Sequence, residues 1–201
     1  MAPKFINKLN HEIGGLNFFL RNLRASYQIQ PISKHPHKHF IICGLPKNFV
    51  DDLDHLHQLL RDGRKINYWR RSILLIKGKS VCCIAKDETD KLIGFDYFYF
   101  RENEVNRGII HEAYIGVAPE YRGQGIGTAL RMISAKNFAI SGLSAISSQI
   151  EEDNLPSLNS ALHAGFHVIN NCKKDKIIHL IFDLSKLKNS ADLILNSDEI
   201  I

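Results

Sequence analysis

The chain has 201 residues with 44% hydrophobic and 23% charged side chains, which suits one globular domain and excludes wholesale disorder. No stretch approaches the ~20 apolar residues of a membrane-spanning helix, and the first residues do not resemble an export signal. The four cysteines lack the spacing of disulfides or of a metal site. We therefore expect a cytoplasmic protein with reduced thiols. Residues 1–40 hold six Lys or Arg and one acid, so this segment alone accounts for the net charge of +5; without a motif, that patch does not predict nucleic-acid binding.

Residues 1–37 form a basic N-terminal extension in which apolar residues recur at helical spacing. The intervals alternate between three and four residues, which places these side chains on one stripe of a helix. They are Ile13, Leu16, Leu20, Leu23 and Tyr27. We expect this helix to dock on the main core; a helix that binds a partner or lies on a membrane surface is the alternative.

Residues 38–185 alternate between apolar runs and helical patterns. Strands are expected at 39–45, 92–100, 109–117, 145–150, 166–170 and 177–182, with short apolar runs at 73–76 and 81–85. Helices are expected at 46–63, 65–71, 126–140 and 155–164. The order predicts an α/β (α+β) fold with a mixed sheet, built from hairpins first and then a crossover. Residues 186–201 are assigned to a C-terminal tail.

The segment from Ile115 to Leu130 carries the clearest chemical signal. A strand ends at Val117, Ala-Pro interrupts it, and a loop with glycines at 123, 125 and 127 leads directly into a helix. Glycines let backbone N–H groups approach a ligand closely. At a helix N-terminus these unpaired donors favour anions, and Arg122 adds a positive charge. The loop therefore predicts a phosphate or pyrophosphate site.

Two familiar phosphate loops do not fit this segment. A P-loop needs Gly-Lys-Ser/Thr, but Gly127 is followed by Thr128. The dinucleotide fingerprint needs a glycine three residues after Gly125, where Thr128 stands, and an acid about 20 residues further on. No Asp or Glu occurs between Glu120 and Glu151.

The pattern Arg122-x-x-Gly125-x-Gly127 after a strand resembles the pyrophosphate loop of the GNAT superfamily of acyl-CoA-dependent N-acyltransferases. Asn154-x-x-Ser157 and the later Ala-Gly-Phe at 164–166 are similar to the family's next helix and closing motif. The resemblance covers about 40–183 and is strongest at 109–166. It implies a GNAT-like fold, a central mixed sheet with splayed strands and flanking helices. The alternative is that the glycines only make a tight turn.

The resemblance also implies which residues hold acetyl-CoA, with no metal. The backbone at Ile115, Gly116 and Val117 would pair with the pantetheine arm, and the amides of the loop and helix start would hold the pyrophosphate. The expected cofactor-binding residues are Ile115, Gly116, Val117, Arg122, Gly123, Gln124, Gly125, Ile126, Gly127, Thr128 and Asn154.

For catalysis, Glu112 is the first candidate for the general base that the attacking amine needs. It lies on the strand expected to face the cleft, and a carboxylate in apolar surroundings accepts a proton more readily. The alternatives are that Glu112 pairs with a surface Arg or Lys at the strand end, and that the base comes from the acids at 151–153. Many family members place a proton-donating tyrosine where this chain has Ala161, which leaves Tyr121 and Ser157 as weaker candidates.

The resemblance implies an N-acetyltransferase that transfers an acetyl group from acetyl-CoA to a primary amine of a small molecule, such as an aminosugar, or of a polypeptide. The alternative is a non-catalytic acyl-CoA-binding regulatory module. The expected partners are acetyl-CoA and an amine acceptor, with no nucleic acid and no membrane span. A homodimer is compatible with the sequence.

Overall fold

The structure, a computed structural model, describes residues 2–37, 39–172 and 176–187, and for 2–11 and 171–172 it describes the backbone alone. The predicted tail at 186–201 therefore lies outside the described residues from 188 onward. Within the described part of the chain, no helix combines the length and apolar character needed to cross a bilayer.

One eight-stranded sheet runs through the molecule, in the order β1-β2-β3-β4-β5-β6-β8-β7. Neighbouring strands are antiparallel except β5 and β6, which are parallel, so the predicted mixed sheet is confirmed. The strands are β1 His35–Pro36, β2 Phe40–Gly44, β3 Cys82–Asp87, β4 Leu92–Tyr99, β5 Ile109–Val117, β6 Ala145–Glu151, β7 His167–Cys172 and β8 Ile177–Asp183.

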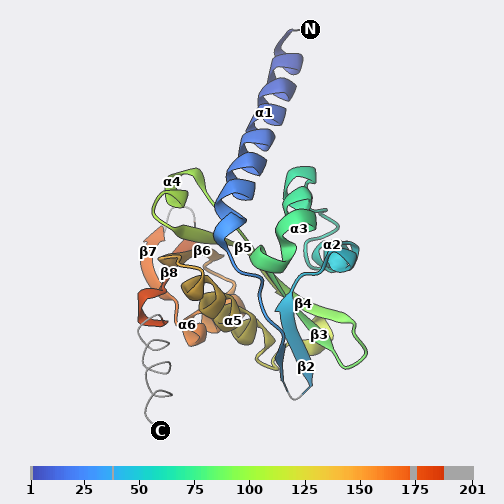
Figure 1. The fold of residues 1–201 in the computed structure, drawn as a ribbon, viewed down its shortest axis with the longest axis vertical. Coiled ribbons are helices and arrows are strands. Elements are labelled where there is room, and N and C mark those ends of the chain that lie inside the picture. Colours follow the sequence, from blue (N-terminus) through green and yellow to red (C-terminus); the bar gives the residue numbers. More distant parts are fainter. Residues whose placement is uncertain (1, 38, 173–175, 188–201) are drawn as a thin grey trace.

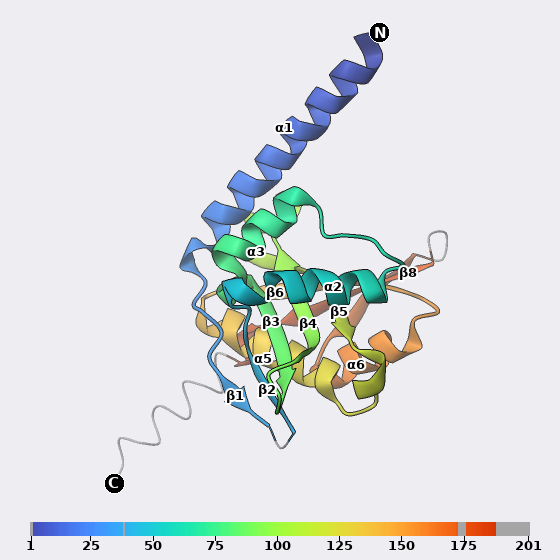
Figure 2. The same cartoon turned by 90° about the vertical axis from the view of Figure 1, so that its right-hand side faces the viewer.

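Helices cover both faces of this sheet (Figures 1 and 2). α5 and α6 lie on one face, and α2 and α3 on the other, so the apolar side chains of the central strands are buried on both sides. The helices are α1 Ala2–Ala25, α2 Val50–Leu60, α3 Tyr68–Val81, α4 Glu102–Val105, α5 Ile126–Ile140 and α6 Leu155–Ala164, with short 3₁₀ turns at Ser26–Gln28, Lys47–Phe49 and Pro119–Tyr121.

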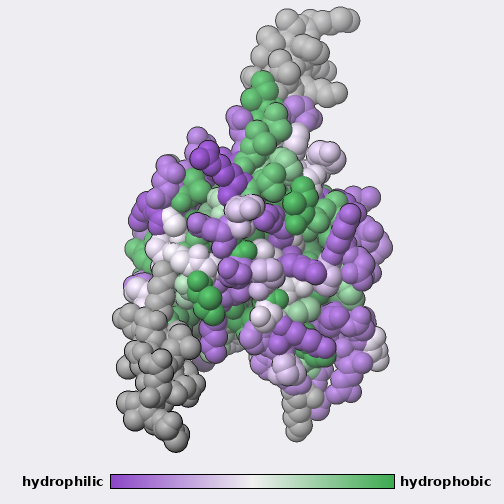
Figure 3. Space-filling model, viewed as in Figure 1, coloured by the Kyte–Doolittle hydropathy of each residue, from purple (hydrophilic) through white to green (hydrophobic). Residues whose placement is uncertain are grey.

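The helices α3 and α1 differ from the sequence expectation, and the short α4 was not expected. α3 continues to Val81 through the run at 73–76, because Ile73 and Leu74 pack into the core from a helix rather than from a strand. α1 docks on the core, as expected, through Phe18, Phe19 and Leu23. Only Leu23 belongs to the predicted stripe, and the other four members of that stripe are exposed, so most of the predicted docking side was wrong. Figures 1 and 2 show α1 extending beyond the rest of the molecule, and Figure 3 shows apolar residues on its exposed side.

A bulge in β5 sets which side chains face which helices. Phe98 of β4 lies opposite Glu112, while the preceding Tyr97 lies opposite Tyr114, so Ala113 is the extra residue. Because a bulge interrupts strand alternation, Glu112 points toward α5 while Tyr114 points toward α2. The two halves of β5 thus present different chemistry to the two sides of the sheet.

Candidate functional site

The site begins where β5 and β6 separate. These strands pair only from Ile109–Ala145 to His111–Ser147, and β6 then pairs with β8 along its whole length. The edge of β5 that faces β6 is therefore without a partner strand over residues 112–117. Backbone N–H and C=O groups along such an edge are available to an extended ligand.

A cavity of about 620 Å³ occupies this separation. The strand edge, the glycine loop and the starts of α5 and α6 all border it. Its lining residues are Leu60, Tyr114, Ile115, Gly116, Val117, Tyr121, Arg122, Gly123, Gly125, Ile126, Gly127, Thr128, Arg131, Asn154, Pro156, Ser157, Asn159, Ser160 and His163. Every residue expected to bind the cofactor is among them except Gln124.

The glycine loop has the backbone that the sequence pattern predicts. Gly123 and Gly125 both have φ of +76°, a left-handed conformation that L side chains rarely adopt. Gly125 is also the N-cap of α5, so the first amides of that helix have no helical acceptor. Arg122 donates from Nε to the carbonyl of Val117 at 3.3 Å, which holds its positive charge at the loop entrance.

Close packing explains two other glycines of the cavity wall. A Cβ at Gly116 would lie 2.5 Å from Leu60 Cδ1, and one at Gly127 would lie 3.2 Å from Ser160 Oγ. Leu60 and Ser160 come from helices distant in sequence from the loop, and no local motif marks them. The sequence therefore predicted the loop but not the side chains that face it.

Glu112 does not face the cavity as an open carboxylate. Arg131 of α5 donates to both of its oxygens, from Nε at 2.8 Å and from Nη2 at 3.0 Å, and Ser148 of β6 donates at 2.7 Å. Arg131 also donates to the carbonyl and the hydroxyl of Ser157. Of the two readings offered by the sequence, this geometry favours the ion pair over the general base.

The candidates for proton donation are also placed by the structure. Ser157 lies at the cavity wall, where its hydroxyl accepts from Arg131 at 3.1 Å. Tyr121 donates its hydroxyl proton to Asp87 at 2.7 Å, so this proton is already engaged. Ala161 is fully buried in α6. Asn154 caps α6 by accepting from the amide of Ser157 at 3.2 Å.

A second carboxyl group lies beneath α5 next to this ion pair. Asp96 is fully buried, and neither of its oxygens has a hydrogen-bond partner among the described residues. Burial, with Glu112 nearby, raises the pKa of Asp96 well above its ordinary value. The charged form of Asp96 is therefore disfavoured next to the ion pair of Glu112 and Arg131.

On the opposite face of the sheet, His111 is the centre of another polar network. Arg101 donates to His111 Nε2 at 2.6 Å and to Gln149 Oε1 at 2.7 Å. Because Nε2 accepts, Nδ1 carries the proton and donates to Ser147 Oγ at 2.9 Å. Burial and the charge of Arg101 lower the pKa of His111 to about 3, so its ring is neutral at pH 7.

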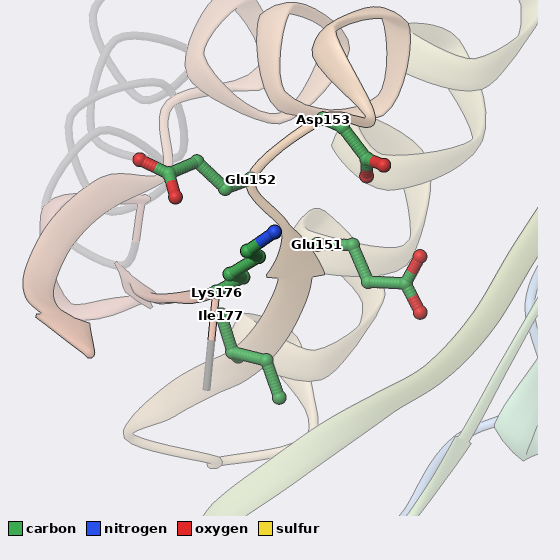
Figure 4. Close-up of a pocket in the computed structure, with 5 residues that line it drawn as sticks. All are labelled: Glu151, Glu152, Asp153, Lys176 and Ile177. Atoms are coloured by element: carbon green, nitrogen blue, oxygen red, sulfur yellow. The ribbon is translucent and has the colours of Figure 1, made fainter. Parts of the chain in front are cut away.

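The acids at 151–153 border a second cavity, of about 430 Å³, beyond the end of β6. Figure 4 shows Glu152 turned to one side of Lys176, and Glu151 and Asp153 turned to the other. Across the described parts of the chain, no three His, Cys, Asp or Glu side chains are grouped closely enough to hold a metal ion.

Comparison with solved structures shows which fold this is. A ribosomal-protein-S5-alanine acetyltransferase of Vibrio fischeri has a TM-score of 0.62 at 16% identity, covering 78% of this chain and 99% of that one. The yncA protein of Salmonella typhimurium, solved with acetyl-CoA as its cofactor, has a TM-score of 0.61 at 16% identity, covering 74% and 95%. At these identities the likeness concerns the fold.

Sequence comparison identifies the family. A mycothiol acetyltransferase of Renibacterium salmoninarum is 31% identical over 84 residues, which are 41% of this chain. The match spans only 25% of that relative's length. Residues 48–166, more than half of the chain, match the acetyltransferase (GNAT) family. This chain therefore belongs to the GNAT acetyltransferase family.

Proposed function

We propose that the protein is an N-acetyltransferase that uses acetyl-CoA to acetylate a primary amine of a small molecule or a polypeptide. The observation that supports this proposal is that three features border one cavity. The unpaired edge of β5, the left-handed glycines and the free amides at the start of α5 all border the same 620 Å³. An extended arm ending in a diphosphate matches these three features together.

The residues present fit acetyl-CoA in shape and charge. The space next to Gly123 and Gly125 is open to a distance of 4 Å, so the loop offers a bare backbone to a phosphate. Arg122 supplies a positive charge there, and the strand edge at 115–117 supplies amide and carbonyl groups for the arm. When bound, acetyl-CoA supplies an acetyl group on a thioester that an amine can displace.

Fewer side chains are placed to transfer protons during the reaction than the sequence suggested. Glu112 is held by Arg131 and Ser148, which leaves it poorly placed to take a proton from an amine. The leaving thiol ordinarily has a pKa of ~8.5, so water can protonate it. Tyr121 and Ser157 both line the cavity, but the Tyr121 hydroxyl already donates to Asp87, so we retain Ser157 as the candidate.

A non-catalytic acyl-CoA-binding module is the second candidate. Two observations favour it: the engagement of Glu112 in an ion pair, and the buried alanine at position 161. Both functions require acetyl-CoA binding, but only the enzyme releases thiol when an amine is present.

The test uses a matched pair of substitutions in the glycine loop. Gly125→Glu places a carboxylate against the diphosphate, whereas Gly125→Gln introduces the same bulk and the same backbone strain without the charge. We expect calorimetry to show that acetyl-CoA affinity falls at least ~100-fold for Gly125→Glu and clearly less for Gly125→Gln. Circular dichroism checks that both variants fold.

Unchanged acetyl-CoA affinity in Gly125→Glu would contradict the loop assignment. Thiol release from acetyl-CoA with a panel of amines then separates the two functions. Release with at least one amine supports the enzyme, and tight binding without release from any amine supports the module.

A further inference from the structure

The sheet face covered by α2 and α3 carries a row of rings next to the cavity. Tyr97 and Tyr99 of β4 and His111 and Tyr114 of β5 form this row, which we call the tyrosine face. The Tyr99 and His111 ring centroids are 5.2 Å apart, and His57 of α2 lies 5.2 Å from Tyr114. Since Tyr114 also lines the cavity, an acceptor bound on the tyrosine face would adjoin the proposed thioester path.

Three guanidinium groups border the tyrosine face. Arg61 lies over the Tyr114 ring at 5.0 Å, and Arg70 lies over the Tyr99 ring at 5.4 Å. Arg101 reaches the same face through its hydrogen bond to His111. Stacking on a ring fixes a guanidinium in place while leaving its N–H edges free to bind an oxyanion.

Two of these groups have no carboxylate partner. No acid within the described residues lies within 4.0 Å of Arg61 or Arg70, and Arg101 only just reaches Glu104, at 4.0 Å. By contrast, Arg71, the next residue of α3, is paired with Asp51 at 2.6 Å. The loop between α2 and α3 adds Arg64 and Lys65 against one acid, Asp62, so the region has an excess of positive charge.

The charges act on the tyrosine face itself. Arg101 and Arg70 both contribute, after burial, to the low pKa of His111, and Arg70 and Arg61 both oppose the rise that burial causes in the pKa of Tyr97. Arg70 therefore acts on both groups, together with Arg101 at His111 and with Arg61 at Tyr97. A second cation placed there, as in a polyamine, would be repelled.

We propose that the acceptor is a small amine that also carries an oxyanion, a carboxylate or a phosphate. Arg61 and Arg70 would bind this anion beside the tyrosine face, where Arg101, held by His111 and Gln149, adds positive charge. Guanidinium groups bind such anions through paired, charge-assisted hydrogen bonds. The anion would orient the amine toward the thioester. This inference rests on the proposed function and narrows its substrate class.

The first experiment compares amines that differ in the anion. Thiol release from acetyl-CoA is measured for the full chain with glycine against glycinamide, and with O-phosphoethanolamine against ethanolamine. We expect at least a tenfold higher kcat/KM for the anionic member of at least one pair. If the members without an oxyanion equal or exceed both anionic members, the inference is overturned and the proposed function stands. The same holds if none of the four is acetylated while another amine of the panel is. No thiol release with any amine of the panel contradicts the proposed function itself.

The second experiment tests the arginines with a matched control. Arg70→Met is expected to raise the KM for the preferred anionic amine about tenfold, with little change for its neutral partner or for acetyl-CoA. Arg71→Met, one residue away but paired with Asp51, should leave all three KM values unchanged. An equal loss for anionic and neutral amines in Arg70→Met indicates a merely structural role and overturns the inference.

A binding measurement makes the result independent of turnover. Trp69 is the only tryptophan of the chain and directly precedes Arg70, so its fluorescence is titrated with each of the four amines. We expect a saturable change with the anionic amines that Arg70→Met weakens and Arg71→Met retains. If no anionic amine produces a saturable change and none is acetylated, the inference is wrong.

Discussion

Arg131 links three elements at the closed end of the cleft. It is among the largest fully buried side chains, and from α5 it reaches Glu112 of β5 and Ser157 of α6. Ser148 of β6 donates to the same carboxylate, so the network spans both strands at the point where they begin to separate. The role of Arg131 is therefore to hold the two strands and α6 in place around the cleft.

We expect Arg131→Met to lower the free energy of unfolding by about 3–5 kcal/mol, because it leaves the Glu112 carboxylate buried without its counter-ion. The double variant Glu112→Gln with Arg131→Met should recover part of this loss, since it removes the uncompensated charge. Urea unfolding of the two single variants and the double variant measures the coupling.

Arg71→Met serves as the control for this series. Its partner Asp51 is largely exposed, so losing this ion pair should cost no more than about 1 kcal/mol. If Arg131→Met were no more costly than Arg71→Met, the buried pair would not hold the cleft as argued.

His111 makes stability depend on pH in a defined direction. Its pKa falls from 6.5 in the unfolded chain to about 3 in the folded one, through burial and then the charges of Arg101 and Arg70, with His179 adding a smaller effect in the same direction. Between these values the unfolded chain binds more protons than the folded chain. The contribution of His111 to the free energy of unfolding is therefore complete above pH 6.5 and is lost as the pH falls toward 3.

Because His111 is protonated at pH 5 in the unfolded chain alone, the free energy of unfolding should be about 2 kcal/mol lower at pH 5 than at pH 7. His111→Gln should remove that part of the pH dependence, because an amide does not titrate. Urea unfolding at pH 7 and pH 5 measures it, and His55→Gln, at an exposed position of α2, is the control. Equal pH dependence in wild type and His111→Gln would show that His111 does not carry the effect.

At the scale of elements, the strands and the two helices after β5 follow the sequence pattern because their apolar residues face one core. α3 was missed in part because a run of apolar residues at 73–76 satisfies either a buried strand or one turn of a helix. α1 was predicted as a helix that docks on the core, but of its predicted stripe only Leu23 lies on the docked side. Periodicity shows which residues share one side of a helix, but it does not show which side packs against the core.

The contact between α1 and α3 depends on one glycine. A Cβ at Gly15 would lie 1.9 Å from Trp69 Nε1, whereas a Cβ at Gly14 would have no neighbour within 4 Å. We expect Gly15→Ala to displace the indole and change its fluorescence. Gly14→Ala should leave the emission unchanged and stabilise the helix by up to about 1 kcal/mol. The same emission from both variants would contradict the packing of α1 on α3.

At the scale of the whole molecule, the site divides into a part that local sequence encodes and a part that the fold assembles. The glycine loop was predictable because its left-handed backbone at positions 123 and 125 needs residues without side chains. The partner of Glu112 was not, since the bulge at Ala113 and the turn of α5 that faces it decide the contact. Leu60 and Tyr114 meet the loop only because β5 brings distant elements to the same opening.

The cleft exists only in the folded chain, because its walls come from both halves of the sheet. A ligand that binds there stabilises the native state alone, and acetyl-CoA at about 100 times its Kd should add roughly 2.7 kcal/mol. For a chain of this length that corresponds to a rise in Tm of about 5–10 °C. Thermal unfolding with and without acetyl-CoA measures it, and Gly125→Glu should show little rise, because its carboxylate opposes the diphosphate. An equal rise in Tm for wild type and Gly125→Glu would place the binding site away from the glycine loop.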